Sequence, residues 1–339
     1  MPPMHDPRFF ALSESRELAA TVAHSAGLEL APLEERRFEG GEFKLRPLES
    51  VRGCIAFVLQ ALAASEAVPT AERFVRLLFL LGGLKDAGAV QRIALVPYLA
   101  YARKERRTQL RDPVNTRYVA ELLEAAGLDR IVALDVHNPA ALDNSFRVPV
   151  DHLTALPMMV DHFARQLGSA PLTVVSPDVG GVKRAQIFRE MLQRRLSREV
   201  EMAFIEKRRA QDVVSSGALV GEVANRQLIL IDDLCASGGT LVRAGDLCRR
   251  AGATAVHAAV THAPLATGLA ALLAAPGLTS VLITDSVGLS HTRAAPPATG
   301  SAKLVTLPVG PLFGEALRRM LCGKPVAPLL EHWPVPAGD

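Results

Sequence analysis

The sequence lacks a strong excess of charge of either sign. Its 339 residues contain 38 Lys and Arg against 35 Asp and Glu, a net charge of +3, which is too mild to indicate a nucleic-acid-binding protein. The basic residues concentrate in two short stretches, 101–111 (YARKERRTQLR) and 205–211 (IEKRRAQ). Where the cations lie therefore matters more than how many there are.

Cysteine is also scarce, and long hydrophobic runs are missing. Cys54, Cys235, Cys248 and Cys322 form no CxxC pair and have no zinc-site spacing, which predicts reduced thiols in a cytoplasmic protein. The longest apolar runs, such as 74–84 (FVRLLFLLGGL), are too short and interrupted to span a bilayer. The first ten residues (MPPMHDPRFF) lack the apolar core of a signal peptide. We therefore expect neither a membrane span nor a targeting segment.

What the sequence does contain is an alternation of strand-like and helix-like stretches. Most of the strand candidates are continuous apolar runs, as in strands buried on both faces of a parallel sheet; they are 54–60, 92–96, 130–135, 172–176, 227–231, 255–260, 280–284 and 303–307. Helix candidates between them are 71–87, 114–126, 157–167, 182–195 and 240–251. The alternation predicts an α/β fold with mostly parallel sheets flanked by helices.

The length suggests about two domains. Prolines in 148–157 (VPVDHLTALP) favour a boundary there, which gives domains of residues 1–154 and 155–339 and leaves the last helix free to pack back on the first domain. Each half holds about the same number of βα units, but no strong repeat is visible, so a duplicated fold is only suggested.

In open α/β sheets, ligands bind at the carboxyl ends of the strands, and one such end has the sequence LILIDDLCASGGTL, residues 228–241. It has neither the GK[ST] of a Walker P-loop nor the GxGxxG dinucleotide fingerprint. A glycine-containing loop at a helix N-terminus binds phosphate through backbone N–H groups, and the acids Asp232 and Asp233 suit the hydroxyls of a sugar phosphate. The alternative is an ordinary β–α turn whose acids cap the helix, and this string alone would favour it.

A second strand end, VVSPDVGGVKRA at residues 174–185, has a similar pattern. The Gly180-Gly181 turn with Lys183 and Arg184 suits a polyphosphate, and Asp178 suits a hard cation such as Mg²⁺ beside it. An ordinary turn is again the alternative, but two such turns in successive βα units make coincidence less plausible.

The remaining candidates are a histidine and the two basic stretches. His137 directly follows strand candidate 130–135, where structural and functional roles are about equally favoured. Basic runs usually form solvated surfaces, but phosphoryl transfer needs cations that neutralise developing charge. The basic residues in question are Arg103, Lys104, Arg106 and Arg107, and Lys207, Arg208 and Arg209.

Taken in order, YARKERR, LDVH, SPDVGGVKRA, KRR and IDDLCASGGT resemble the ribose-phosphate pyrophosphokinase family, and the likeness runs from about residue 36 to 286. The resemblance implies two phosphoribosyltransferase-like α/β domains and a homo-oligomer, either a dimer or a hexamer. It also implies transfer of the diphosphoryl group of Mg-ATP to O1 of ribose 5-phosphate, which yields phosphoribosyl pyrophosphate and AMP.

The resemblance further implies a role for each matching residue. The ribose 5-phosphate site would comprise Asp232, Asp233, Ala236, Ser237, Gly238, Gly239 and Thr240, and Gly180 and Gly181 would lie at the diphosphate. His137 and Asp178 would help to hold Mg²⁺ and ATP, and Lys207 and Arg209 would act on the transition state. The remaining nucleotide contacts would come from Arg103, Lys104, Phe38, stacked on adenine from a neighbouring subunit, and Glu42.

The sequence departs from the family at four positions in three functional motifs. Gly40 and Ala236 stand where the family commonly has Asp, and Lys104-Glu105 replaces Gln-Asp. The C-terminal stretch 324–333 also lacks the serines that bind regulatory phosphate in many members. A different nucleotide donor, a different pentose phosphate and altered regulation therefore remain open. Two other classes also remain: a phosphoribosyltransferase that uses phosphoribosyl pyrophosphate, and a non-catalytic partner of an active synthetase.

Overall fold

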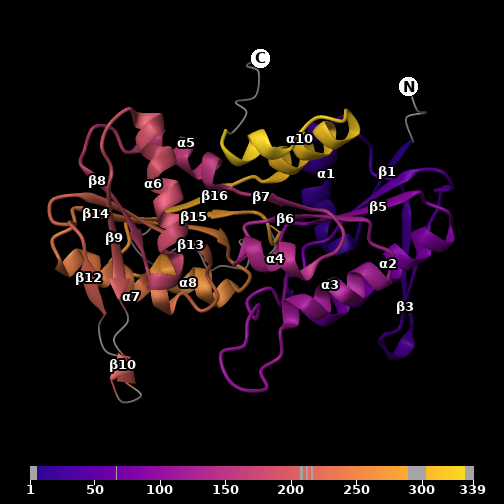
Figure 1. Ribbon diagram of the computed structural model, residues 1–339, viewed down its shortest axis with the longest axis horizontal. Coiled ribbons are helices and arrows are strands. Elements are labelled where there is room, and N and C mark those ends of the chain that lie inside the picture. The colour runs from indigo at the N-terminus through magenta and orange to yellow at the C-terminus, as the bar shows by residue number, and fades with distance from the viewer. Residues whose placement is uncertain are drawn as a thin grey trace. The chain divides into compact units, whose positions relative to one another are not determined.

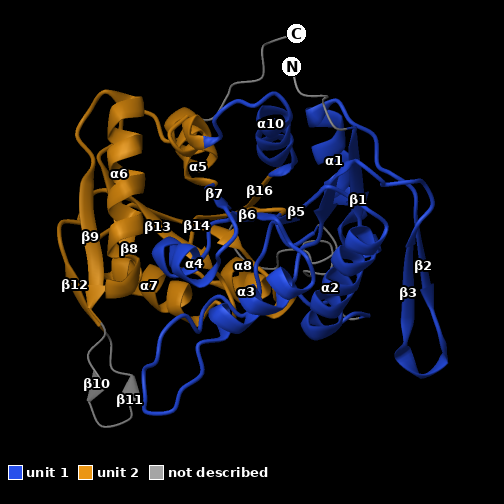
Figure 2. Cartoon of the chain, turned by 45° about the vertical axis from the view of Figure 1, so that its right-hand side comes forward, with its two compact units in different colours: residues 1–154, 286–288, 309–326 blue, residues 155–285, 289–308, 327–339 orange. Residues whose placement is uncertain are grey.

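The computed structural model describes residues 6–65, 67–206, 209–210, 213–214, 217–288 and 303–332. Parallel strands and helices alternate along the chain (Figure 1). All eight predicted strands and all five predicted helices are present. The described residues form two compact units (Figure 2): residues 6–154, 286–288 and 309–326 belong to the first, and residues 155–285, 303–308 and 327–332 to the second.

The first unit is built on a parallel sheet in the order β1 (Pro7–Ala11), β4 (Ile55–Leu59), β5 (Gln91–Val96), β6 (Arg130–Leu134) and β7 (Val150–Leu153). Its helices include α1 (Arg16–Ala26), α2 (Thr70–Asp86), α3 (Asn115–Ala125), α4 (Pro139–Ser145) and α10 (Gly310–Leu321). Short 3₁₀ turns occupy η1 (Ser13–Ser15) and η2 (Glu39–Gly41). The sequence prediction placed β7 in a connection between domains, because its residues VDHL do not form a continuous apolar run.

Two layers of helices cover this sheet. Val58 and Ala94 belong to the same buried cluster as Leu77 of α2 and Leu123 of α3. Phe57 alternates with Val58 along β4 and faces the end of α10 on the other side of the sheet. Complete burial of such side chains contributes about 1.5–3 kcal/mol each. An antiparallel hairpin, β2 (Leu33–Arg37) and β3 (Phe43–Pro47), packs its Leu33 and Leu45 side chains on the core.

The second unit has a sheet in the order β12 (Ala218–Val220), β9 (Glu201–Glu206), β8 (Leu172–Ser176), β13 (Gln227–Leu234), β14 (Ala255–His262), β15 (Ser280–Thr284) and β16 (Lys303–Leu307). Only β12 is antiparallel to its neighbour in this set. Two short strands, β10 (Arg209–Ala210) and β11 (Val213–Val214), pair with each other.

Helices pack on both faces of this sheet as well. One buried cluster joins strand residues such as Leu230 and Val256 to α7 (Gly239–Arg250) and α8 (Ala266–Ala274). On the other face lie α5 (Leu156–Gln166) and α6 (Val182–Leu196), where Phe163 and Phe188 make an edge-on contact at 6.3 Å. The 3₁₀ turns η3 (Val179–Gly181) and η4 (Ala327–Leu330) also belong to this unit. Among the described residues, no helix is both long enough and apolar enough to cross a bilayer.

Candidate functional site

Two adjacent carboxylates near the end of β13 share one guanidinium. The strand continues to Leu234, beyond its predicted end at residue 231, so Asp232 and Asp233 lie within it. Arg184 of α6 places its Nη1 atom 3.3 Å from Oδ1 of Asp232 and 3.1 Å from Oδ1 of Asp233. The sequence favours a polyphosphate as the partner of Arg184, which stays a prediction; in the structure its guanidinium bridges the acidic pair. Strand β8, which precedes α6, pairs directly with β13 and thereby brings the three side chains together.

The positive charge of Arg184 does not fully offset the burial of Asp232 and its repulsion by Asp233. Burial, and then the charge of Asp233, raises the pKa of Asp232 to about 7, although the charge of Arg184 acts in the opposite direction. Two acids held this close favour a ligand that supplies hydroxyl donors or a further cation. The pair is thus better suited to a polyhydroxylated ligand than to simple helix capping.

The turn that follows β13 requires glycine at one position. Gly238 has a φ of 77°, and a Cβ atom there would lie 2.8 Å from the carbonyl oxygen of Gly268. The N-cap residue of α7 is Gly238, which has no side chain to cap the first N–H groups of the helix. Ser237 is exposed and Thr240 is half-buried beside them. This is the arrangement that binds phosphate at a helix N-terminus.

The two residues before Ser237 pack against other parts of the second unit. Cys235 is buried, and burial together with the charge of Asp232 raises the pKa of its thiol to about 11. The thiol therefore stays protonated near neutral pH and acts as a small filler. The carbonyl oxygen of Ala236 packs closely against Gly268 of α8. A Cβ atom at Gly268 would lie only 1.9 Å from that oxygen.

The turn that follows β8 is closed by Asp178. Its Oδ1 atom accepts a hydrogen bond from the backbone N–H of Gly181 at 3.2 Å, and the hydroxyl of Ser176 donates to its carbonyl oxygen at 2.6 Å. A Cβ atom at Gly181 would lie 2.7 Å from that hydroxyl, whereas the closest contact at Gly180 would be 3.3 Å. Asp178 thus has a capping role in this turn, and its role in holding a metal stays a prediction.

The predicted phosphate-binding loops of the second unit follow neighbouring parallel strands. Strands β9, β8 and β13 pair in that order, so the segments after them begin at the same edge of the sheet. The basic segment after β9 is only partly described. Lys207 and Arg208 lie outside the described residues, and Arg209 is described by its backbone in β10 alone.

In the first unit, the predicted nucleotide-binding residues follow β5 and β6, which are also parallel neighbours. Arg103, in the loop after β5, is exposed, whereas Lys104 pairs with Asp112. His137, after β6, is exposed. Two residues before it, the buried Asp135 has a φ of 38° and accepts a hydrogen bond from the hydroxyl of Thr154 at 2.6 Å. Left-handed backbone at a non-glycine residue is uncommon and clusters at functional sites; no residue pattern in the sequence predicted it.

The other predicted nucleotide contacts lie on the hairpin of the first unit. The Phe38 side chain is 40% exposed, and the guanidinium carbon of Arg36 lies 4.9 Å from the centre of its ring. Glu42 is exposed. Gly40, which replaces the Asp of the family motif, has a φ of 81°, a conformation that glycine adopts at little cost.

A buried ionic cluster anchors the base of this hairpin. Arg76 of α2 contacts Glu14 at 2.5 Å, and Glu35 of β2 and Glu72 of α2 at 3.5 Å each. Burial, followed by the charge of Glu14, raises the pKa of Glu35. The sequence did not predict this cluster because its members are far apart along the chain. Glu14 lies 62 positions from Arg76, and Glu35 lies 41 positions from it.

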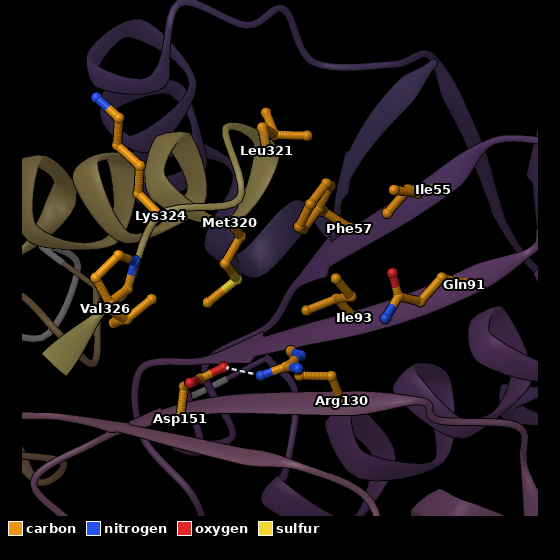
Figure 3. A pocket seen from close by; sticks show the side chains of 11 residues that line it. Ile55, Phe57, Gln91, Ile93, Arg130, Asp151, Met320, Leu321, Lys324 and Val326 are labelled. Carbon is orange, nitrogen blue, oxygen red and sulfur yellow. Dashed lines mark hydrogen bonds and ion pairs between the residues drawn. The ribbon is translucent and has the colours of Figure 1, made fainter. Parts of the chain in front are cut away.

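A pocket of about 340 Å³ lies elsewhere in the first unit. Its walls include Phe57 and Met320, and the ion pair of Arg130 and Asp151 closes one side at 2.6 Å (Figure 3). Several lining residues stand at or near the beginnings of β4 to β7, so the pocket lies at the opposite edge of the sheet from Arg103 and His137. We therefore exclude it from the candidate site.

Comparisons with known proteins match both halves of the chain. Residues 8–127 match the N-terminal domain of ribose phosphate pyrophosphokinase, and residues 150–271 match the phosphoribosyl transferase domain. Ribose-phosphate pyrophosphokinase 1 of Streptococcus pyogenes is 34% identical over 330 residues, which are 96% of this chain and 98% of that protein. The Streptococcus pneumoniae protein of the same name is 33% identical over 96% of this chain and 97% of its own length.

A solved structure extends the similarity to the fold. Phosphoribosylpyrophosphate synthetase from Mycobacterium smegmatis is 32% identical, with a TM-score of 0.84 over 94% of this chain and 99% of that one. The expected α/β architecture with phosphoribosyltransferase-type domains is thereby confirmed. The chain belongs to the ribose-phosphate pyrophosphokinase family.

Proposed function

We propose that this protein transfers the diphosphoryl group of Mg-ATP to O1 of ribose 5-phosphate. The O1 hydroxyl attacks the β-phosphorus, the bond from that phosphorus to the α,β-bridging oxygen breaks, and AMP leaves while the hydroxyl proton passes to solvent. The observation that carries the proposal is the acidic pair Asp232 and Asp233 beside the uncapped N-terminus of α7. It joins a hydroxyl-binding group to a phosphate-binding group in one unit, as a pentose 5-phosphate requires.

The roles of the individual residues are those that the family resemblance implies for the matching positions. Ser237, Gly238, Gly239 and Thr240 hold the 5-phosphate, Asp232 and Asp233 accept hydrogen bonds from ribose hydroxyls, and Gly180 and Gly181 lie at the diphosphate. Arg103 binds the ATP phosphates, and Phe38 stacks on the base with Glu42 nearby. Lys207 and Arg209 neutralise charge on the migrating group, which is the main catalytic contribution in phosphoryl transfer.

The protein groups proposed for magnesium are Asp178 and His137. Among the described residues, no group of three His, Cys, Asp or Glu side chains forms a metal site. A nucleotide-bound Mg²⁺ keeps several waters and takes phosphate oxygens together with one or two protein ligands. When bound with ATP, Mg²⁺ would neutralise phosphate charge and leave the protein to orient the two substrates.

We also propose that the protein works in the cytoplasm as a homo-oligomer, either a dimer or a hexamer. The four cysteines are free, as expected in a reducing compartment. The oligomer is what the family resemblance implies, with Phe38 reaching the nucleotide of a neighbouring subunit. Light scattering of the purified protein measures the number of copies, and a monomer at the concentration of the activity assay would contradict this proposal.

The activity is tested by AMP release from purified protein. We expect AMP only when ATP, Mg²⁺ and ribose 5-phosphate are all present, and about a 100- to 1,000-fold lower kcat in Lys207→Ala. Lys324→Ala, at an exposed lysine after α10, is the matched control and should retain full activity. Base-dependent release of pyrophosphate from phosphoribosyl pyrophosphate would instead indicate a phosphoribosyltransferase. Activity only after addition of a second synthetase would indicate a regulatory partner.

A further inference from the structure

The loop after β5 is closed by one carboxylate oxygen. Oδ2 of Asp112 accepts hydrogen bonds from the backbone N–H groups of Thr108 at 3.0 Å and Gln109 at 2.9 Å, and from the Thr108 hydroxyl at 2.8 Å. The ammonium group of Lys104 pairs with the same oxygen and donates to the Thr108 hydroxyl at 3.0 Å. One acidic side chain thus joins both ends of the segment 104–112.

The environment of this pair favours a lasting interaction. The side chains of Lys104 and Asp112 are 31% and 22% exposed, so neighbouring groups cover part of each. The hydrogen bonds, first from Lys104 and then from Thr108, hold the pKa of Asp112 well below its ordinary value. The carboxylate therefore stays ionised, and remains a charged acceptor for the loop, near neutral pH.

Other contacts hold the loop on the N-terminal side of Arg103. The hydroxyl of Thr116 in α3 donates to the carbonyl oxygen of Ala102 at 3.4 Å. The ring of Tyr101 makes an edge-on contact with Phe74 of α2 at 6.4 Å. Arg103 consequently lies between two fixed points, the contacts of Tyr101 and Ala102 before it and the pair of Lys104 with Asp112 after it.

Apart from Glu105, whose side chain is 9% exposed, the segment enclosed by the pair has little other support. Leu110 is 91% exposed, and the Arg106 side chain is 78% exposed. A chain segment with such exposure does not keep one conformation by apolar burial. Its order depends on polar contacts, and most of those in the segment end on Asp112.

We propose that Asp112 is a positioning residue for nucleotide binding: it holds Lys104 and the loop amides, and so fixes the backbone from which Arg103 reaches the ATP phosphates. Lys104 then acts through Asp112 and does not contact the nucleotide itself. The nucleotide-binding part of this inference rests on the proposed function. The part that concerns closure of the loop does not.

Two measurements on Asp112→Asn, Lys104→Gln and the double variant test this inference. Hydrogen exchange of the Thr108 and Gln109 amides reports loop closure without any substrate. It should become at least about ten-fold faster in Asp112→Asn, because a charge-assisted acceptor is lost. The KM for ATP should rise about ten-fold in each single variant, with the KM for ribose 5-phosphate unchanged.

The double variant distinguishes an indirect role of Lys104 from a direct one. If the two residues act as one pair, the double variant is no worse than either single variant. Glu121→Gln, which removes an exposed ion pair of 2.8 Å with Arg117 on α3, is the matched control and should change neither measurement.

Three results would overturn the inference. Unchanged exchange at Thr108 and Gln109 in Asp112→Asn would show that Asp112 does not close the loop. A raised KM for ATP in Lys104→Gln but not in Asp112→Asn would make Lys104 a direct ligand. If the wild-type protein forms no AMP from ATP and ribose 5-phosphate, the proposed function and the nucleotide role of Asp112 both fail, and amide exchange alone then decides whether Asp112 closes the loop.

Discussion

Replacement of Asp232 by Asn should stabilise the unliganded protein while it removes activity. The pKa of Asp232 lies near 7 in place of the ordinary 3.8, so the folded state holds a proton that the unfolded state releases between these values. The free energy of unfolding therefore falls as the pH rises from about 4 to about 7. Below that pH window, the free-energy cost of ionising Asp232 in the folded protein is absent. Above the window, the full cost applies.

The size of the effect follows from the same values. Each pKa unit corresponds to about 1.4 kcal/mol, so a pKa of 7 in place of 3.8 gives an upper limit of about 4 kcal/mol. Because Asp232 titrates together with Asp233, one substitution recovers only part of this limit, on the order of 2 kcal/mol. Because Asn is neutral at every pH, Asp232→Asn should gain that amount at pH 8 and about half of it at pH 5.5.

Urea unfolding followed by circular dichroism at pH 5.5 and pH 8 measures this difference. Asp143→Asn is the matched control, because Asp143 is exposed on α4 of the other unit, and its stability should follow that of the wild type. AMP formation by Asp232→Asn should fall at least about ten-fold, because a ribose hydroxyl loses a charged acceptor. A variant less stable than the wild type at pH 8, or a gain that is equal at both pH values, would refute the reasoning.

Three further substitutions or treatments test other features. Gly238→Ala should raise the KM for ribose 5-phosphate at least about ten-fold, because the left-handed backbone and the 2.8 Å approach force the turn to move; an unchanged KM would contradict this role. Arg76→Met should lower the free energy of unfolding by about 3–5 kcal/mol, because three carboxylates lose their buried cation. Arg117→Met at an exposed pair should be nearly neutral, and equal losses in both would count against the cluster. At pH 7, iodoacetamide should label the exposed Cys322 and spare Cys235, whose pKa is raised to about 11; mass spectrometry of peptides would reveal the opposite result.

The sequence was informative wherever the signal is local. Runs such as 172–176 are apolar because the strand is buried on both faces, and they predicted the sheets. By contrast, β7 carries His152 and Asp151 and has no such signature. Its place in the sheet follows from pairing with β6, a tertiary effect.

The candidate site shows the same division. Asp232 and Asp233 stood out because adjacent acids after a buried strand are unusual. The contact of Arg184 with both acids was not predicted. It depends on the pairing of β8 with β13, and the residues next to Arg184 in the sequence carry no sign of that pairing. The contact of Lys104 with Asp112 spans only eight positions, but it requires a closed loop that no helical or strand period predicts.

The close approach of Ala236 to Gly268 limits how this protein can change its substrate. A side chain at position 268 would occupy the space of the Ala236 carbonyl oxygen, so the turn before α7 and the first turns of α8 cannot vary independently. A variant with a wider turn, suited to a bulkier sugar phosphate, would need α8 to retreat at the same time. Laboratory evolution of pentose selectivity should therefore keep glycine at position 268, because any side chain there meets the backbone carbonyl oxygen of residue 236, which no substitution at 236 removes.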